Sequence, residues 1–183
     1  MIRNSIQIRP AQPADAEVAA VLLYSAYTHN QLAYPLQDAR ENEWIERLAS
    51  YFGQAGNRFS YQNTQVATLD GAVVGLVLSF GGRDEAQLNA DVGSWLEREA
   101  ADDEWYVDAL AVFTDWGRKG IGTRLLQATE QMARQRHYPN IGLHVAPENQ
   151  SALALYARLK YVAAENTILY GRPYIHMVKT LSP

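Results

Sequence analysis

Hydrophobic and polar positions along the chain follow two periods, and together they predict a mixed order of strands and helices. Isoleucines set among polar residues predict a short strand at 6–10. Apolar residues at helical spacing predict one helix over 15–29, capped by Asp15, and a second helix over 38–52. The first quarter of the chain is therefore expected to be a strand followed by two helices.

Two β-rich runs, 65–69 and 72–80, are joined by Asp70-Gly71. An Asp-Gly pair between two such runs is a strong signal for a two-residue hairpin turn. Residues 84–101 follow, with several acids and scattered apolar positions, and they predict a helix or a lid-like insertion.

The second half of the chain contains a strand–helix–strand unit. Its first segment is almost continuously apolar, which predicts a strand buried on both faces. Because strand, helix and strand form one βαβ unit, the two strands should run parallel, with a right-handed crossover. The predicted elements are a strand at 105–113, a helix at 123–136, a strand at 141–145, a helix at 150–159 capped by Asn149, and strands at 167–170 and 174–180. The predicted fold class is α+β with a mixed sheet, in one domain over 1–183.

Composition excludes several classes of function. The chain has 183 residues, 16 Lys+Arg against 20 Asp+Glu, four His and no Cys, with a net charge of −4. We therefore expect no nucleic-acid partner, no disulfide, no thiolate nucleophile and no cysteine zinc site. The histidines show no metal-ligand spacing. The start of the chain lacks a signal-peptide core and no apolar stretch is long enough to span a membrane, which favours a cytoplasmic protein.

A glycine turn, Gly117-Arg-Lys-Gly-Ile-Gly122, separates the predicted strand at 105–113 from the helix after it. The free N–H groups at such a helix start bind phosphate oxygens, and Arg118 and Lys119 add positive charge. A P-loop is excluded because Lys119 precedes the second glycine. A dinucleotide fingerprint is excluded because Leu125 occupies the position of its third glycine. The alternative is a helix start that needs only a tight turn.

Residues 106–162 resemble the core of the GNAT N-acyltransferase superfamily. The resemblance rests on Leu110-Ala-Val112, on the glycine turn and on Asn149-x-x-Ala-Leu-x-Leu-Tyr156, together with the order of the flanking elements. One departure is Gly117, where the family motif begins with Gln or Arg, and another is Lys160-Tyr161 in place of Gly-Phe. The resemblance implies a central twisted mixed sheet of about six to seven strands, about four flanking helices and two central parallel strands that splay apart.

This resemblance implies an acetyl-CoA-dependent N-acetyltransferase. Its acetyl group would move directly from the CoA thioester to a primary amine of a small molecule or peptide. The diphosphate would lie on the amides of the glycine turn, and pantetheine would pair with the first of the two splayed strands. The implied cofactor-binding residues are Leu110, Ala111, Val112, Gly117, Arg118, Lys119, Gly120, Ile121, Gly122, Thr123, Asn149 and Tyr156. No metal is implied.

The resemblance also implies catalytic roles for two side chains. Tyr156 occupies the helix position from which a phenol can protonate the leaving sulfur, although a core aromatic residue is the alternative. Asp108 lies in the middle of the predicted strand and is the candidate base that collects the amine proton, with a purely structural acid as the alternative. Glu104 is the fallback base, and a chain of water molecules without a dedicated base is also open. Asn149 caps the helix, contacts the cofactor, or does both.

The residues that would bind the acceptor amine are less well defined by the sequence. Tyr27 and Tyr34 belong to the aromatic loop 27–35, which would line the acceptor pocket or be an ordinary surface loop. His144 is expected to be a packing or hydrogen-bonding residue inside its strand. A non-catalytic CoA-binding sensor or interaction module of the same fold is the alternative function, and a nicotinamide oxidoreductase is disfavoured by the missing third glycine. A homodimer is compatible with the family, and the sequence leaves the oligomeric state open.

Overall fold

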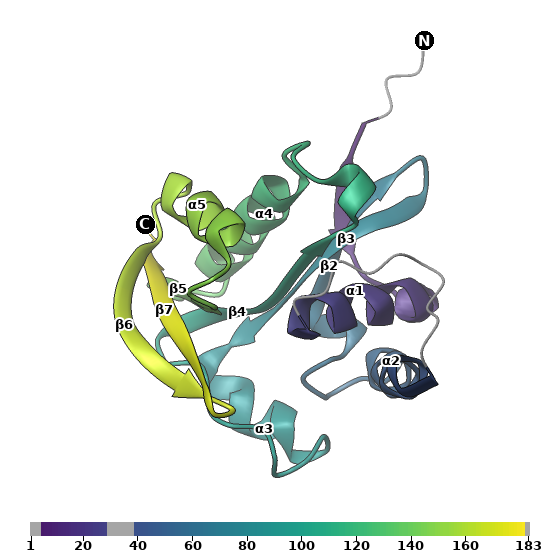
Figure 1. The fold of residues 1–183 in the computed structure, drawn as a ribbon, viewed down its shortest axis with the longest axis horizontal. Coiled ribbons are helices and arrows are strands. Elements are labelled where there is room, and N and C mark those ends of the chain that lie inside the picture. The colour runs from purple at the N-terminus through teal and green to yellow at the C-terminus, as the bar shows by residue number, and fades with distance from the viewer. Residues whose placement is uncertain (1–4, 29–38, 182–183) are drawn as a thin grey trace. The chain divides into compact units, whose positions relative to one another are not determined.

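Seven strands of the described residues form one mixed sheet in the order β1-β2-β3-β4-β5-β7-β6. The computed structural model describes residues 5–28 and 39–181. Its strands and α-helices are β1 (Gln7–Pro10), α1 (Ala16–Thr28), α2 (Ala39–Phe52), β2 (Thr64–Leu69), β3 (Ala72–Gly81), α3 (Glu85–Ala90), β4 (Glu104–Val112), α4 (Ile121–Gln135), β5 (Asn140–Val145), α5 (Gln150–Arg158), β6 (Val162–Leu169) and β7 (Arg172–Thr180) (Figure 1). Short 3-10 turns cover Pro13–Asp15, Tyr61–Asn63, Gly82–Asp84 and Thr114–Trp116. The α+β class and the mixed sheet are confirmed.

Strands β4 and β5 pair in parallel, and they belong to the predicted strand–helix–strand unit. Its register joins Glu104–Val107 to Asn140–Leu143, although β4 continues to Val112 and β5 to Val145. The pairs β1–β2, β2–β3, β5–β7 and β6–β7 are antiparallel.

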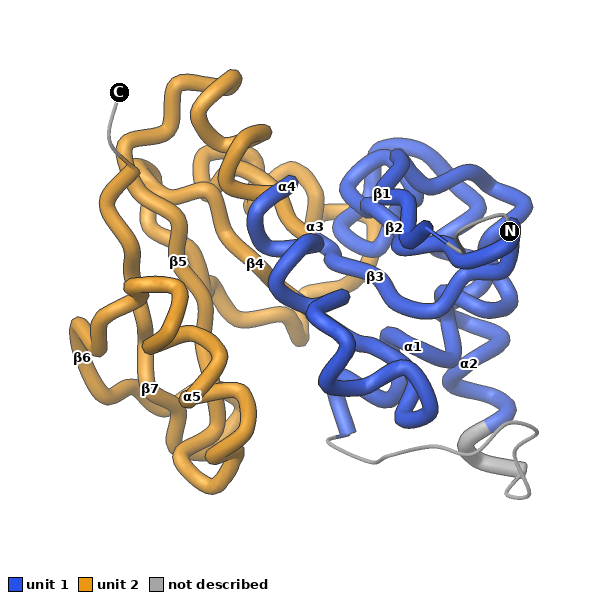
Figure 2. Tube along the Cα trace, turned by 90° about the horizontal axis from the view of Figure 1, so that it is seen from above, with its two compact units in different colours: residues 1–78, 109–128 blue, residues 79–108, 129–183 orange. Residues whose placement is uncertain are grey.

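The chain divides into two compact units (Figure 2). Unit 1 contains Met1–Leu78 and Ala109–Ala128, and unit 2 contains Ser79–Asp108 and Thr129–Pro183. In unit 1, α1 and α2 pack side by side, and β2 and β3 form the predicted hairpin (Figure 1). Asp70 and Gly71 both have positive φ, as a type I′ turn requires, so the Asp-Gly prediction is confirmed.

In unit 2, β6 and β7 form a long curved hairpin (Figure 1). β6 begins at Val162, five residues before the predicted strand at 167. The prediction failed there because most side chains of this strand are exposed, so no buried alternation marks it. Phe80, Ala100 and Tyr106 form a core cluster, and Leu88 of α3 packs against it.

Three further predictions need correction. The segment 84–101 is helical only over Glu85–Ala90, and Gly93, with φ of 149°, lies just after this helix in a conformation that other residues rarely adopt. β4 is buried on both faces only as far as Val107, after which buried and half-buried residues alternate. Asp15 does not cap α1; its carboxylate accepts a bond from the N–H of Gln12 at 2.8 Å and pairs with Arg9 at 2.7 Å.

Candidate active site

The glycine turn before α4 presents a run of unpaired main-chain N–H groups. After β4 the chain makes one 3-10 turn, and Gly117 donates to the carbonyl of Thr114 at 3.0 Å. Arg118 and Gly120 then have positive φ values of 57° and 78°. Among the described residues, none accepts a hydrogen bond from the main-chain N–H groups of Arg118 to Gly122. These donors adjoin the positive end of the α4 dipole, which suits an anion with several oxygens.

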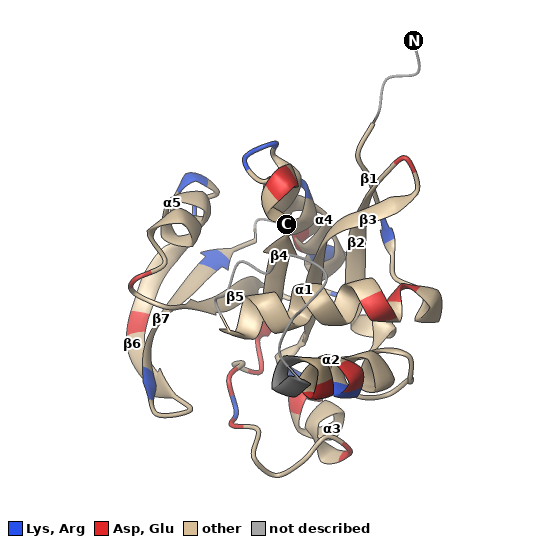
Figure 3. Cartoon of the chain, turned by 45° about the vertical axis from the view of Figure 1, so that its right-hand side comes forward, with Lys and Arg blue, Asp and Glu red and all other residues tan. Residues whose placement is uncertain are grey.

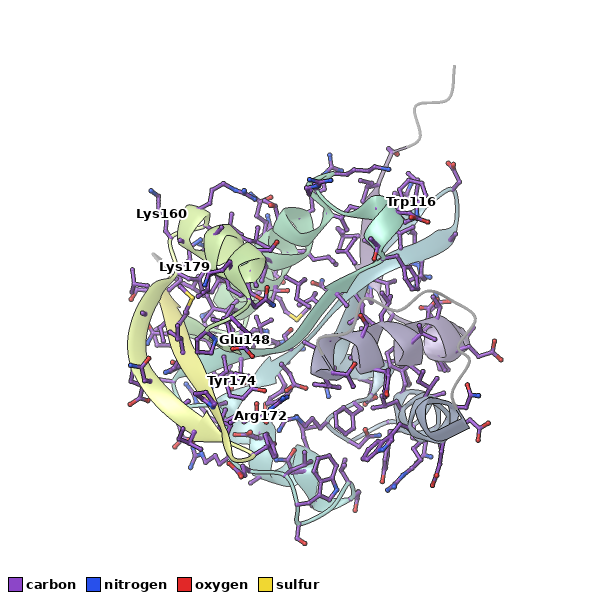
Figure 4. All side chains as sticks on the ribbon, in the orientation of Figure 1. Trp116, Glu148, Lys160, Arg172, Tyr174 and Lys179 are labelled. Carbon is purple, nitrogen blue, oxygen red and sulfur yellow. The ribbon has the colours of Figure 1, made fainter. Side chains whose placement is uncertain are left out.

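The cationic side chains of this turn differ in their contacts. Lys119 donates to the carbonyl of Asp115 at 3.0 Å, and its ammonium lies 4.3 Å from the ring centre of Trp116. Trp116 lies just ahead of α4 (Figure 4), and the Lys and Arg positions of the turn are marked in Figure 3. Arg118 is exposed and has no such contact among the described residues. Arg118 is therefore the more available cation for a bound anion.

The end of β4 lies close against β3 in unit 1. A Cβ atom added to Gly75 would be 2.9 Å from the carbonyl oxygen of Ala111, so only glycine permits this approach. Phe113 donates its N–H to the carbonyl of Val74 at 3.0 Å. The predicted pantetheine-binding stretch, Leu110 to Val112, is thus part of a firmly held strand.

In unit 2, α5 carries the predicted acid. Asn149 caps the helix, because its side-chain oxygen accepts the N–H of Ala152 at 3.1 Å. Tyr156 is buried, with its ring 5.9 Å from that of Tyr161, and burial raises the pKa of its phenol to about 12. No described residue forms a hydrogen bond with the hydroxyl of Tyr156.

Asp108 and Glu104 lie on the same face of β4, because side chains alternate along a strand. Asp108 is half-buried. Both carboxylate oxygens of the buried Glu104 lie 3.1 Å from Nε2 of His176. Gly142 on β5 leaves the space that this carboxylate fills, since an added Cβ would overlap it. The carboxylate of Glu104 is therefore engaged by His176.

Sequence reasoning missed a polar network on this face of unit 2. The hydroxyl of Tyr106 donates to Oε2 of Glu99 at 2.7 Å and lies 3.0 Å from Nδ1 of His144. The ring of His144 stacks on that of His176 with centroids 4.7 Å apart, and Tyr174 meets it edge-on. The alternation of side chains along β4 could have indicated part of this network, because it places Tyr106 on the same face as Asp108. The other members could not be found in this way, because they lie on β5, on β7 and in the loop before β4, which are distant in sequence.

Two histidines of the network have opposite pKa shifts. The hydrogen bond to Glu104 raises the pKa of His176, and Glu165, 3.7 Å from its Nδ1, adds to this. Burial lowers the pKa of His144 to about 4, with a further contribution from His176. Burial also raises the pKa of Tyr174, which appears with Glu148 beside β7 in Figure 4.

The predicted acceptor residues are only partly described. Tyr27 is in the last turn of α1, partly exposed, and its ring meets that of Phe59 edge-on at 5.9 Å. Tyr34 lies outside the described residues. In 5–28 and 39–181, no group of three or more His, Asp or Glu residues is arranged to hold a metal ion. Over the same ranges, no helix combines the length and apolarity needed to cross a bilayer.

The strand order, the parallel pairing of β4 with β5 and the glycine turn before α4 together define an α+β acetyltransferase fold. The sequence model of the Acetyltransferase (GNAT) family matches residues 23–161, which is most of the chain. The protein belongs to this family, and the resemblance noted in the sequence is confirmed. No curated protein matches the chain by sequence.

Solved structures show the same fold over nearly the whole chain. An N-acetyltransferase from Staphylococcus aureus Mu50 is 24% identical with a TM-score of 0.80, covering 94% of this chain and 100% of its own. A structure described as an acetyltransferase is 26% identical with a TM-score of 0.79, covering 96% and 100%. The PaiA N-acetyltransferase from Thermoplasma acidophilum, solved in complex with coenzyme A, is 15% identical with a TM-score of 0.62, covering 96% and 99%.

Proposed function

We propose that this protein transfers an acetyl group from acetyl-CoA to a primary amine of a small molecule or peptide. The observation that carries the proposal is the run of unpaired N–H groups from Arg118 to Gly122 at the start of α4. Membership of the GNAT family and the coenzyme A complex of the Thermoplasma relative support the choice of anion. The thioester supplies the activated acetyl group, and the residues of this chain bind and orient it.

The binding residues divide into two sets. The N–H groups of the turn, together with Arg118 and the hydroxyl of Thr123, bind the diphosphate oxygens. The backbone of Leu110 to Val112 pairs with the amides of the pantetheine arm. One amide of that stretch donates to the thioester oxygen, where negative charge develops during the reaction. Asn149 holds α5 in place through its cap.

Tyr156 stabilises the leaving sulfur. Its pKa of about 12 means that the phenol keeps its proton at neutral pH. A thiol has a pKa of about 8.5, so complete transfer of the phenol proton to a thiolate would be uphill by roughly 5 kcal/mol. Tyr156 therefore donates a hydrogen bond to the sulfur as charge builds there, and solvent supplies the proton that the released thiol carries.

Two measurements test the proposal. Titration calorimetry with folded protein is expected to show binding of both CoA and acetyl-CoA. A CoA-release screen over chemically diverse amines is expected to find at least one acceptor. Absence of affinity for CoA would refute the proposal. Binding without turnover on any amine would instead favour the non-catalytic CoA-binding module.

A further inference from the structure

Unit 2 contains a cavity of about 450 Å³ that is lined by α3, by the turn before it and by the segment that leads from α3 to β4. α3 packs Leu88 against the core cluster of this unit and turns another side toward the cavity. The residues of that side are spaced one and four apart, as one stripe of a helix requires, and they are Glu85, Ala86, Asn89 and Ala90. A cavity of this volume is large enough to hold a small molecule.

Hydrogen bonds hold the segment opposite α3 in place. The carboxylate of the buried Glu85 accepts the main-chain N–H groups of Glu99 at 2.9 Å and Ala100 at 3.1 Å. The hydroxyl of Tyr170, in the turn between β6 and β7, donates to Oε1 of Glu99 at 2.7 Å and accepts the N–H of Glu97 at 3.2 Å (Figure 1). The cavity is therefore preformed, which lowers the entropy cost of binding a ligand.

Arg83 and Arg98 line the cavity, and both contact Asp102. Nε of Arg83 donates to the main-chain carbonyl of Asp102 at 3.0 Å, and its guanidinium lies 4.8 Å from the ring centre of Tyr138. Arg98 pairs through Nη2 with Oδ1 of Asp102, and its Nε donates to the carbonyl of Ala100 at 3.2 Å. Both arginines are exposed, so their guanidinium groups lie where the cavity opens to solvent. Each guanidinium is thus held in position through its Nε.

This arrangement leaves the cavity with an excess of hydrogen-bond donors. Among the described residues, none accepts a hydrogen bond from either Nη group of Arg83, from Nη1 of Arg98 or from the hydroxyl of Ser94. The carboxylates of Glu85 and Asp102 also line the cavity, but the first is engaged by main-chain N–H groups and the second by Arg98. Spare donors that carry positive charge favour an oxyanion, and the planar guanidinium matches a carboxylate.

The lining also includes the apolar residues Ala86, Ala90 and Leu96. A carbon skeleton can cover such residues, whereas a bare inorganic anion would leave them in contact with water. We propose that this cavity binds a small organic acid with two carboxylate groups, one for each arginine. The site uses none of the residues assigned to CoA, so the inference goes beyond the proposed acetyl transfer and does not depend on it.

Nuclear magnetic resonance of the full chain tests the site, with succinate as the probe. Ionic strength is held constant with sodium chloride, so that a general attraction between charges does not register. The amide signals of residues 82–102 are expected to shift and to saturate, with a Kd of about 1 mM or lower. Inorganic phosphate lacks the two methylene groups that succinate can bury, so it should bind the same residues at least about tenfold more weakly.

Substitutions inside and outside the cavity separate it from the rest of the positively charged surface. Arg83→Gln and Arg98→Gln should each raise the Kd for succinate about fivefold or more, because each removes one charged donor. Arg172→Gln removes an exposed arginine at the start of β7 that does not line the cavity, and it should leave the Kd within about twofold. Ala86→Leu retains every charge but fills the cavity from α3, so it should abolish saturable binding. The amide spectrum of each variant shows that it is folded before it is titrated.

The possible results either support this site or overturn it. Shifts that rise linearly up to about 20 mM succinate, without saturation, would show that the cavity holds no such ligand. Shifts confined to residues 117–123 would place the anion on the glycine turn instead. Phosphate that binds as tightly as succinate would exclude an organic acid as the preferred ligand, and an unchanged Kd in Ala86→Leu would exclude the cavity. None of these results requires CoA binding or turnover, so failure of this proposal can be distinguished from failure of the proposed function.

Discussion

Gly120→Ala is the most direct test of the anion-binding turn. Gly120 has a φ of 78°, and an added Cβ would meet no atom within 4 Å. The substitution therefore introduces backbone strain and no steric overlap. Relief of that strain requires rotation of the peptide units on either side, and these are the units whose N–H groups we expect to contact the diphosphate.

The size of each effect follows from this geometry. An alanine held in the left-handed region costs about 1–2 kcal/mol, which for a chain of this length lowers the melting temperature by roughly 2–4 °C per kcal/mol. Loss of one hydrogen bond to a charged ligand costs about 1.5–3 kcal/mol. The dissociation constant for CoA should therefore rise by about 10- to 100-fold.

Gly71→Ala is the matched control. Gly71 has a φ of 84°, and its added Cβ would also meet no atom within 4 Å, but it lies in the β2–β3 turn. Calorimetry and thermal melts should show a similar loss of stability in both variants and weaker CoA binding only in Gly120→Ala. Pantetheine, which lacks the diphosphate, should bind both variants equally. Unchanged CoA affinity in Gly120→Ala would refute the placement of the diphosphate on this turn.

Three further substitutions test other parts of the structure. Tyr156→Phe should lower kcat about tenfold at every pH from 7 to 10, with CoA affinity unchanged, because a pKa of about 12 keeps the phenol protonated over that range; an unchanged kcat in CoA-release assays would exclude the sulfur contact. Asp15→Asn should lower the free energy of unfolding by about 1 kcal/mol at pH 7, since Arg9 is partly exposed and the pair is screened. Arg9 holds the pKa of Asp15 below its ordinary value near 4, so this contribution is present above pH 4 and is lost as the pH falls below it; denaturation curves of the two proteins that stay apart at pH 2 would contradict this. Gly142→Ala should destabilise the protein by about 1–3 kcal/mol, because its Cβ would overlap the carboxylate of Glu104; urea denaturation with an unchanged midpoint would show that the carboxylate can move at little cost.

Short sequence motifs predicted the turns and helix starts that are formed by residues close together in the sequence. The type I′ turn at Asp70-Gly71 depends on two adjacent residues, and the start of α5 depends on a cap three residues away. The parallel pair followed from one buried strand, one helix and a second strand in succession. The length of β6 did not follow, because an exposed strand at the edge of a sheet has no buried alternation to mark it. The helix predicted within 84–101 ended after six residues, where the segment turns to bury Ala100 against the end of β3.

In the candidate site, too, the parts formed by consecutive residues were predictable and the parts formed by tertiary pairing were not. The glycine turn was predictable because its donors come from consecutive residues, so their arrangement is set by the backbone of one short segment. The network around His144 is assembled from β4, β5, β7 and the loop before β4, and only tertiary pairing brings these together. From the sequence alone, a histidine in a strand is most simply a packing or hydrogen-bonding residue. Its hydrogen-bond partner is found only when the strands pair, because the hydroxyl of Tyr106 then lies 3.0 Å from its Nδ1.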